Sequence, residues 1–139
     1  MIRVDLPDEE LDMLRLLAGQ MAELMEDGPP DEVRDRLFPP AYDDAIKQAE
    51  FRRLMATDLE ERKKADLQTM RATLERSPVD LEPEHAAAWL SSLQDMRLTI
   101  GTLLGIDHDG WESEDIDDPQ FAVLHYLGFV QDSIVGALG

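Results

Sequence analysis

The stretch WLSSLQDMRLTIGTLLG, Trp89–Gly105, places an acid, a base and a glycine within a strongly apolar run. Five of its apolar residues recur at spacings of four and three, which puts them on one line of an α-helix. They are Trp89, Leu93, Met96, Ile100 and Leu103. Proline is common at the first position of a helix and glycine just after its end. We therefore predict a core helix that starts near Pro83 and ends at Gly105.

Two of the unusual residues in this helix have a structural interpretation. Arg97 lies between Leu90 and Leu104 on a second line of the helix, so its alkyl stem can pack while its guanidinium reaches a carboxylate. We expect a structural ion pair between Arg97 and an acidic residue of the middle helix. The candidate acids are Asp43, Asp44 and Glu50. Gly101 costs about 1 kcal/mol relative to alanine inside a helix, which favours the close approach of a neighbouring helix there.

The same helical spacing recurs on both sides of this stretch. It predicts a first helix over about Pro7–Glu26, a long helical segment over roughly Asp43–Arg76 and a last helix over about Pro119–Ala137. Within the long segment, Thr57–Glu60 has the form of a capping box, which favours either a kink or two helices meeting there. No alternating pattern longer than Ile2–Val4 suggests a strand. The predicted fold class is therefore all-α: a single-domain helical bundle of four to six helices.

The apolar positions also predict which residues are buried. On the first helix they are Leu11, Leu14, Ala18, Met21 and Met25. On the last helix the predicted inward face consists of Phe121, Leu124, Leu127, Gln131 and either Ile134 or Val135. Between the long segment and the core helix, the sequence SPVDLEP (Ser77–Pro83) is expected to be a connector.

The composition limits the kinds of partner. The chain has 139 residues, which we take as one domain over residues 1–139, and its abrupt start is consistent with a missing leading segment. Its 13 Lys and Arg oppose 31 Asp and Glu, a formal net charge of −18. Such a charge repels phosphate backbones and anionic lipids, so the sequence disfavours unaided nucleic-acid binding and membrane binding. It favours a protein partner with a basic surface, in an association that weakens with salt.

The absence of cysteine limits the chemistry. It excludes disulfides, thiolate nucleophiles and cysteine-ligated metals. No apolar run approaches about 18 residues and the start does not have the form of a signal peptide, so we expect a cytoplasmic protein. Most methionines lie on predicted core faces, which leaves any redox control to a partner. We expect no cofactor.

Two segments carry a family resemblance. AYDDAIKQAEFRRLMATDLEERKKADL (Ala41–Leu67) and WLSSLQDMRLTIGTLLGI (Trp89–Ile106) resemble an actinobacterial family called domain of unknown function two thousand and seventeen. The matching residues are Tyr42, Asp43, Asp44, Glu50, Phe51, Arg52, Trp89, Leu90, Leu93, Asp95, Arg97, Leu98 and Gly101. Gln94 and Met96 depart from the family's usual Asn and Leu.

That family is associated with oxidative-stress transcriptional regulators of the AosR type, and its members tend to be encoded near the Clp adaptor ClpS. The resemblance implies an all-α regulator that acts through protein contacts, and it does not imply a catalytic site. A sigma factor or another transcription component is the partner that it suggests. A switch based on a thiol–disulfide pair is excluded for this chain, because it has no cysteine.

The acidic segment before the last helix is a second candidate interaction site. Its acids and its single aromatic residue favour a docking loop in which Trp111 is an apolar anchor. The loop residues are Asp107, Asp109, Trp111, Glu112, Glu114 and Asp115. The alternative is a solvated loop whose Trp111 lies against the bundle. A calcium loop is excluded, because aligning Gly110 to the sixth position leaves Ile116 at the last ligand position, where a carboxylate is required.

Two other functions stay open beside the main expectation, a non-enzymatic regulatory domain. A carboxylate–metal hydrolase is the alternative from another class, since Glu82 and His85 are spaced as in di-metal helical bundles. Such bundles need a second pair of this kind, and no glutamate lies three residues before His108 or His125. A homodimeric structural protein is the third interpretation.

Overall fold

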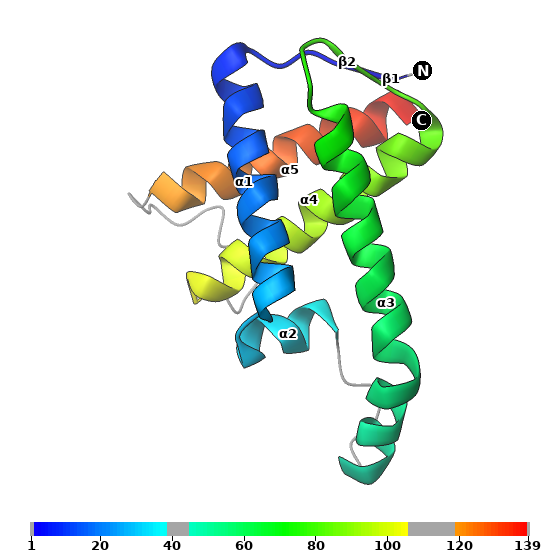
Figure 1. Ribbon diagram of the computed structural model, residues 1–139. Coiled ribbons are helices and arrows are strands. Elements are labelled where there is room, and N and C mark those ends of the chain that lie inside the picture. The colour runs from blue at the N-terminus through cyan, green and yellow to red at the C-terminus, as the bar shows by residue number, and fades with distance from the viewer. Residues whose placement is uncertain (1, 39–44, 106–118, 139) are drawn as a thin grey trace.

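The structure, a computed structural model, describes residues 2–38, 45–105 and 119–138 (Figure 1). Within these ranges the chain forms five α-helices and one two-stranded sheet. In chain order the elements are β1 Ile2–Val4, α1 Asp8–Asp27, α2 Asp31–Leu37, α3 Ala45–Thr73, β2 Val79–Leu81, α4 Pro83–Leu103 and α5 Pro119–Leu138. The predicted helical bundle of four to six helices is confirmed, and the small sheet is an addition to it.

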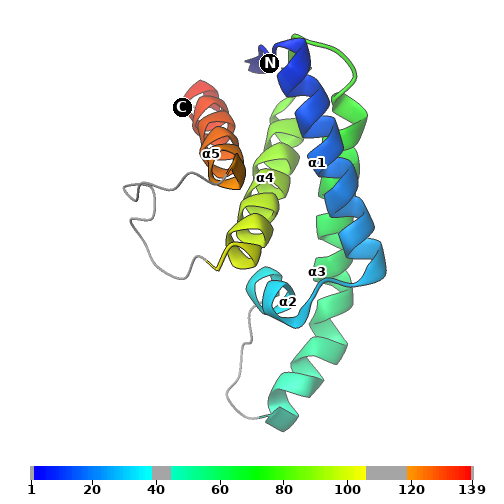
Figure 2. The same ribbon diagram turned by 90° about the vertical axis from the view of Figure 1, so that its left-hand side faces the viewer.

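α4 is the central helix of the bundle. Figure 2 shows α5 on one side of α4 and α1 with α3 on the other, and α4 contacts all four other helices. Trp89 and Leu93 are fully buried, and the Trp89 indole N–H donates a hydrogen bond of 2.7 Å to the Thr73 hydroxyl of α3. The apolar line predicted from the sequence therefore forms the core as far as Met96. At its far end Leu103 is 64% exposed.

Most helix boundaries agree with the sequence pattern. α1 and α5 begin and end within one residue of the predicted positions, and the whole predicted stripe of α1 is buried. α3 continues through Thr57–Glu60, so two helices do not meet there, and the kink that was the other alternative stays a prediction. A capping box begins a helix only where the preceding residues are not helical, whereas residues 46–56 are mostly helix-forming types.

The sheet joins the start of the chain to the segment before α4. β1 pairs antiparallel with β2 in a register that sets Ile2 opposite Leu81 and Val4 opposite Val79. These four side chains are buried, while the middle residues of both strands are exposed. β2 lies within the segment Ser77–Pro83 that the sequence predicts to be a connector, because three residues are too few to establish an alternating pattern.

α5 is more apolar than the sequence analysis allowed. By length and composition alone it could cross a membrane, since its most apolar 18-residue window has a mean hydropathy of 1.4. Asp132 is its single acidic residue, and it contains no lysine or arginine. The expectation that no apolar run approaches membrane length therefore needs correction. Core helices of other proteins meet the same criterion, so it assigns no location to this protein.

The close helix approach predicted at Gly101 is not found in the described part of the chain. A Cβ atom built on Gly101 meets no atom within 4 Å there. The glycine therefore carries its conformational cost without the packing benefit that the sequence analysis expected.

Replacing Gly101 with alanine is expected to raise the free energy of unfolding by about 1 kcal/mol, because alanine favours the helix and restricts the unfolded chain. Urea unfolding followed by circular dichroism measures the change. Gly28→Ala is the control: Gly28 follows α1 with φ of +88°, where alanine is strained, so this variant should lose stability. A destabilised Gly101→Ala variant would mean that a close contact does form at Gly101.

Candidate functional site

α1 presents an exposed ridge between two grooves. We define the α1 ridge as Leu16, Gln20, Glu23 and Asp27, whose spacings of four, three and four keep them on one side of the helix. All four side chains are exposed, and Leu16 exposes 61% of its surface. The buried stripe on the other side fixes α1 against the bundle. The ridge is thus held in place while it remains accessible.

An apolar groove lies on one side of the ridge, between α1 and α4. Its volume is about 220 Å³. The lining residues are Leu17, Gln20, Met21 and Leu24 of α1 and Met96, Thr99, Ile100 and Leu103 of α4. In each helix these residues follow the spacing i, i+3, i+4, i+7, so each helix contributes one continuous face. The groove is therefore a place where α4's apolar line leaves the core and becomes accessible.

The polar group inside the apolar groove already has a partner. The Thr99 hydroxyl donates a hydrogen bond of 2.8 Å to the Asp95 carbonyl and lies 3.7 Å from the Met21 sulfur. Because the Thr99 hydroxyl already donates its hydrogen bond to the helix backbone, it does not require a polar group from a ligand. Met21 and Met96 supply flexible, polarisable side chains that adapt to the shape of an occupant. The groove consequently favours an apolar side chain over a polar one.

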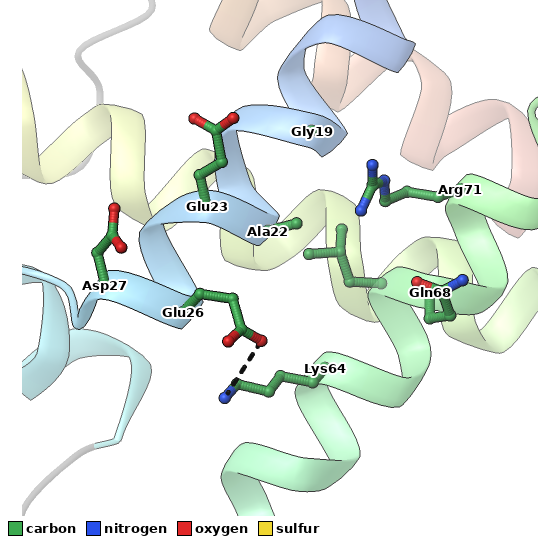
Figure 3. A pocket seen from close by; sticks show the side chains of 9 residues that line it. Gly19, Ala22, Glu23, Glu26, Asp27, Lys64, Gln68 and Arg71 are labelled. Atoms are coloured by element: carbon green, nitrogen blue, oxygen red, sulfur yellow. Dashed lines mark ion pairs between the residues drawn. The ribbon is translucent and has the colours of Figure 1, made fainter.

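A charged groove lies on the other side of the ridge, between α1 and α3 (Figure 3). Its volume is about 400 Å³. The lining residues are Gly19, Ala22, Glu23, Glu26 and Asp27 of α1 and Lys64, Leu67, Gln68 and Arg71 of α3. Lys64 Nζ lies 3.8 Å from Glu26 and 3.2 Å from Glu60, and its hydrogen bond to Glu60 raises the pKa of Lys64. Arg71 extends toward Gly19 (Figure 3).

The carboxylates of the ridge are available to a partner. Residues 8–37, which span α1 and α2, contain ten Asp and Glu against three Arg. Glu23 and Asp27 form no ion pair with any other described residue. Exposed carboxylates without a cation attract a basic surface and lose that attraction as salt is added. Two unpaired acids therefore stand on the ridge between the two grooves.

A buried ion pair joins α3 to α4 next to Met21, which also lines the apolar groove. Lys63 Nζ of α3 lies 2.9 Å from Asp95 Oδ1 of α4, and the two side chains are 15% and 9% exposed. Burial raises the pKa of Asp95, and the hydrogen bond and charge of Lys63 oppose that increase. Lys63 also lies 5.8 Å from the centre of the Phe38 ring, which follows α2. One lysine thus ties α2, α3 and α4 together.

Comparison with known proteins assigns the chain to a family. The family model described as Domain of unknown function (DUF2017) matches residues 1–138. The chain belongs to the DUF2017 family. No curated protein and no solved structure matches it. The description of the DUF2017 family names no activity, so a function has to be argued from the grooves and the charges of this chain.

The DUF2017 chain uses Arg97 differently from the sequence prediction. The Arg97 guanidinium donates a 2.7 Å hydrogen bond to the Gln131 side chain of α5 and lies over Gly128. Glu50 is exposed in α3 and forms no ion pair with Arg97, while Asp43 and Asp44 lie outside the described residues. Arg97 bonds to α5 rather than to α3 because it lies on the side of α4 that faces α5. An ion pair between α3 and α4 does exist, but it joins Lys63 to Asp95, which the sequence analysis did not pair.

The other sequence candidates are placed only in part. Asp107, Asp109, Trp111, Glu112, Glu114 and Asp115 lie outside the described residues of the DUF2017 chain, so the acidic docking loop stays a prediction. Glu82 and His85 are at the start of α4. Across residues 2–38, 45–105 and 119–138, no group of three or more His, Cys, Asp or Glu side chains is placed to hold a metal ion. The hydrolase alternative therefore has no supporting observation in these ranges.

Proposed function

We propose that this DUF2017 protein is a non-enzymatic regulatory domain that binds a basic amphipathic helix of a protein partner. The observation that carries this proposal is the combination of an apolar groove with unpaired carboxylates on the ridge beside it. An amphipathic helix binds by placing side chains at i, i+3, i+4 and i+7 into an apolar groove. The groove's two lining faces have that same spacing, which suits a third helix lying along them.

Charge favours a basic helix over an acidic or neutral one. Glu23 lies one turn from Gln20 and Asp27 lies one turn from Leu24, and both Gln20 and Leu24 line the apolar groove. Lysines or arginines flanking the partner's apolar face would therefore reach these acids. The net charge of −18 would also attract such a helix from a distance. An acidic helix would meet repulsion from both sources. The partner chemistry is therefore apolar on one face and basic on its borders.

We further propose that the partner is a transcription component such as a sigma factor, bound in the cytoplasm during an oxidative-stress response. The support for this finer proposal is the sequence resemblance to AosR-type regulators. Since the chain has no cysteine, the oxidant signal would reach it through the partner. This protein would then regulate its partner by binding a basic helix that the partner otherwise uses to contact another molecule.

The proposal predicts that Leu103→Asp weakens the binding of a basic amphipathic peptide by more than about tenfold, because an anchor in the apolar groove is replaced by a hydrated charge. The probe is a synthetic helix with leucines at i, i+3, i+4 and i+7 and lysines at the borders, labelled for fluorescence anisotropy. Phe129→Asp on α5 is the matched control. Phe129 is 67% exposed against 64% for Leu103, and both changes add one negative charge.

Two further results would separate the contributions to this binding. Glu23→Lys with Asp27→Lys is expected to weaken the peptide and to flatten the dependence of its affinity on salt. Phe129→Asp is expected to bind as well as the unmodified protein. Equal weakening by Leu103→Asp and Phe129→Asp, or no binding of the probe at all, would contradict the proposed function.

A further inference from the structure

The charged groove between α1 and α3 has two walls of opposite charge (Figure 3). Among the described residues that line it, α1 contributes three carboxylates and no cation, and α3 contributes two cations and no carboxylate. At one end an ion pair of 3.8 Å between Lys64 and Glu26 crosses from wall to wall. The rest of the groove remains open between the two helices, with an acidic wall on one side and a basic wall on the other.

Of the two cations on the α3 wall, Arg71 has no partner. Its guanidinium forms no hydrogen bond or ion pair with any residue that the structure describes, whereas Lys64 is paired with Glu60 and Glu26. Figure 3 shows Arg71 extending across the groove toward Gly19 of α1. A guanidinium binds a carboxylate through two parallel hydrogen bonds. This end of the groove therefore offers a site for a carboxylate.

Gly19 keeps the space in front of Arg71 open. It lies inside α1, where glycine is unfavourable relative to alanine. A Cβ atom built on Gly19 meets no described atom within 4 Å, and because Gly19 lines the charged groove, a side chain there would occupy that space. Gly101, by contrast, lines neither the apolar nor the charged groove. An occupant of the groove accounts for a glycine that helix packing does not explain.

The α1 wall determines the other half of the ligand. Glu23 follows Gly19 by one turn, about 6 Å along the axis of α1, and it forms no ion pair with another described residue. A ligand carboxylate held by Arg71 in front of Gly19 would thus have an anionic group one turn away. In an extended lysine at the end of a peptide, the terminal carboxyl carbon and the Nζ atom are about 7.5 Å apart. That separation matches the spacing in the groove.

We propose that the charged groove binds the carboxyl end of a peptide that finishes in lysine or arginine, with the terminal carboxylate on Arg71 and the side-chain cation on Glu23. The groove volume of about 400 Å³ is sufficient for a small ligand. Free lysine is disfavoured, because its α-ammonium group would lie beside the Arg71 guanidinium, whereas in a peptide that nitrogen is a neutral amide. This site lies on the other side of the α1 ridge from the apolar groove and goes beyond the proposed function.

Three peptides test the two charges separately. N-acetyl-glycyl-lysine carries both charges, its C-terminal amide lacks the carboxylate, and N-acetyl-glycyl-norleucine lacks the cation. Titration into isotope-labelled protein, followed by NMR chemical shifts, measures the dissociation constants. We expect about 1 mM for N-acetyl-glycyl-lysine and values about fivefold higher for the other two peptides and for free lysine, since an exposed ion pair contributes little in water. Equal affinities for the three peptides, or no binding at about 20 mM, would overturn the proposal.

Gly19→Leu tests the open space in a variant that should fold. Leucine favours the helix and its Cβ atom has room, so the resistance to urea should increase. The affinity for N-acetyl-glycyl-lysine should nevertheless fall by more than about tenfold, because the leucine side chain fills the space in front of Arg71. A Gly19→Leu variant that binds this peptide as well as the unmodified protein does would rule out the site.

Arg71→Gln tests the carboxylate contact. This variant should bind N-acetyl-glycyl-lysine and its C-terminal amide equally, because the group that distinguishes them is gone. Arg62→Gln is the matched control, since Arg62 is also exposed on α3 but does not line the charged groove. It should keep the preference for the free carboxylate. A preference retained in Arg71→Gln, or lost equally in Arg62→Gln, would contradict the assignment of the carboxylate to Arg71.

The proposed function and this site can fail separately. Gly19 and Arg71 do not line the apolar groove, so Gly19→Leu should bind the basic amphipathic helix normally. Leu103→Asp should in turn bind N-acetyl-glycyl-lysine normally. Glu23 is shared by the two sites, and Glu23→Gln should weaken both ligands. Loss of N-acetyl-glycyl-lysine binding in Leu103→Asp would locate this peptide in the apolar groove and overturn the charged-groove site.

Discussion

Replacing Lys63 with methionine is expected to lower the free energy of unfolding by about 3–5 kcal/mol, because it leaves a buried carboxylate without its cation. Asp95 is 9% exposed, and the Lys63 ammonium lies 2.9 Å from it. Methionine keeps most of the apolar stem of the side chain and removes the charge, so the loss reports the ion pair rather than a cavity. Urea unfolding at neutral pH, followed by circular dichroism, measures the change.

Lys64→Met is the matched control for this variant. The two lysines are neighbours in α3, but Lys64 is 36% exposed and its partner Glu60 is 45% exposed. An exposed pair contributes about 0–1 kcal/mol, since water and salt screen it. Lys63→Met combined with Asp95→Asn should recover much of the lost stability, because the carboxylate charge is removed as well. Similar losses in Lys63→Met and Lys64→Met would contradict a special role for the buried pair.

The dependence on pH provides a second readout of the same pair. Burial raises the pKa of Asp95, so the folded protein holds this proton more tightly than the unfolded chain does. Stability from this group is therefore present at acid pH and is lost as the pH rises through the folded pKa. In Lys63→Met the opposing effect of the ammonium is gone and the pKa rises further. The destabilisation of Lys63→Met should accordingly be smaller at acid pH than at neutral pH.

This ion pair illustrates how far the sequence could be interpreted. The apolar line of α4 and the buried stripe of α1 follow from helical periodicity, because each residue's face is a local property. The partner of a polar residue is not local. The sequence predicts an acidic partner for Arg97 on the middle helix, whereas the structure turns Arg97 toward Gln131 of α5. Lys63 carried a usable signal, since it lies four residues from both Leu59 and Leu67 on the inward side of α3.

The candidate site was harder to predict than the core. Leu103 belongs to the same apolar line as Trp89 and was expected to be buried with it. Whether the end of such a line is covered depends on how far the neighbouring helices extend, and α1 leaves a groove there instead. The groove is therefore visible only once the helices are placed.

Trp89→Ala is expected to cost about 3–5 kcal/mol, as large-to-small changes in a rigid core do. Trp89 is fully buried at the centre of the bundle, where it joins α4 to α3. Surrounding helices cannot collapse into the space without breaking their other contacts, so a cavity would remain. The loss should appear as a lower urea midpoint with an unchanged slope of the unfolding transition. A variant that kept its midpoint would mean that α3 and α4 do not meet at this residue.

Two milder variants divide that cost into packing and hydrogen bonding. Trp89→Phe keeps an aromatic ring but loses the 2.7 Å hydrogen bond to Thr73, and it should cost about 1–2 kcal/mol. The Thr73 hydroxyl is not left unpaired, because it lies 2.9 Å from the Thr69 and Met70 carbonyls, to which it can donate. Thr73→Val instead leaves the buried indole N–H without an acceptor, at a cost of about 1–3 kcal/mol. A loss of stability in Thr73→Val at least as large as that in Trp89→Phe would show that the unpaired indole N–H, rather than the missing hydrogen bond, sets the cost.

Since Trp89 lies on the same line of α4 as Leu103, these variants also test whether the buried end of that line holds α4 in place. The apolar groove at Leu103 can keep a fixed shape only if the buried end of α4 is held in place in this way.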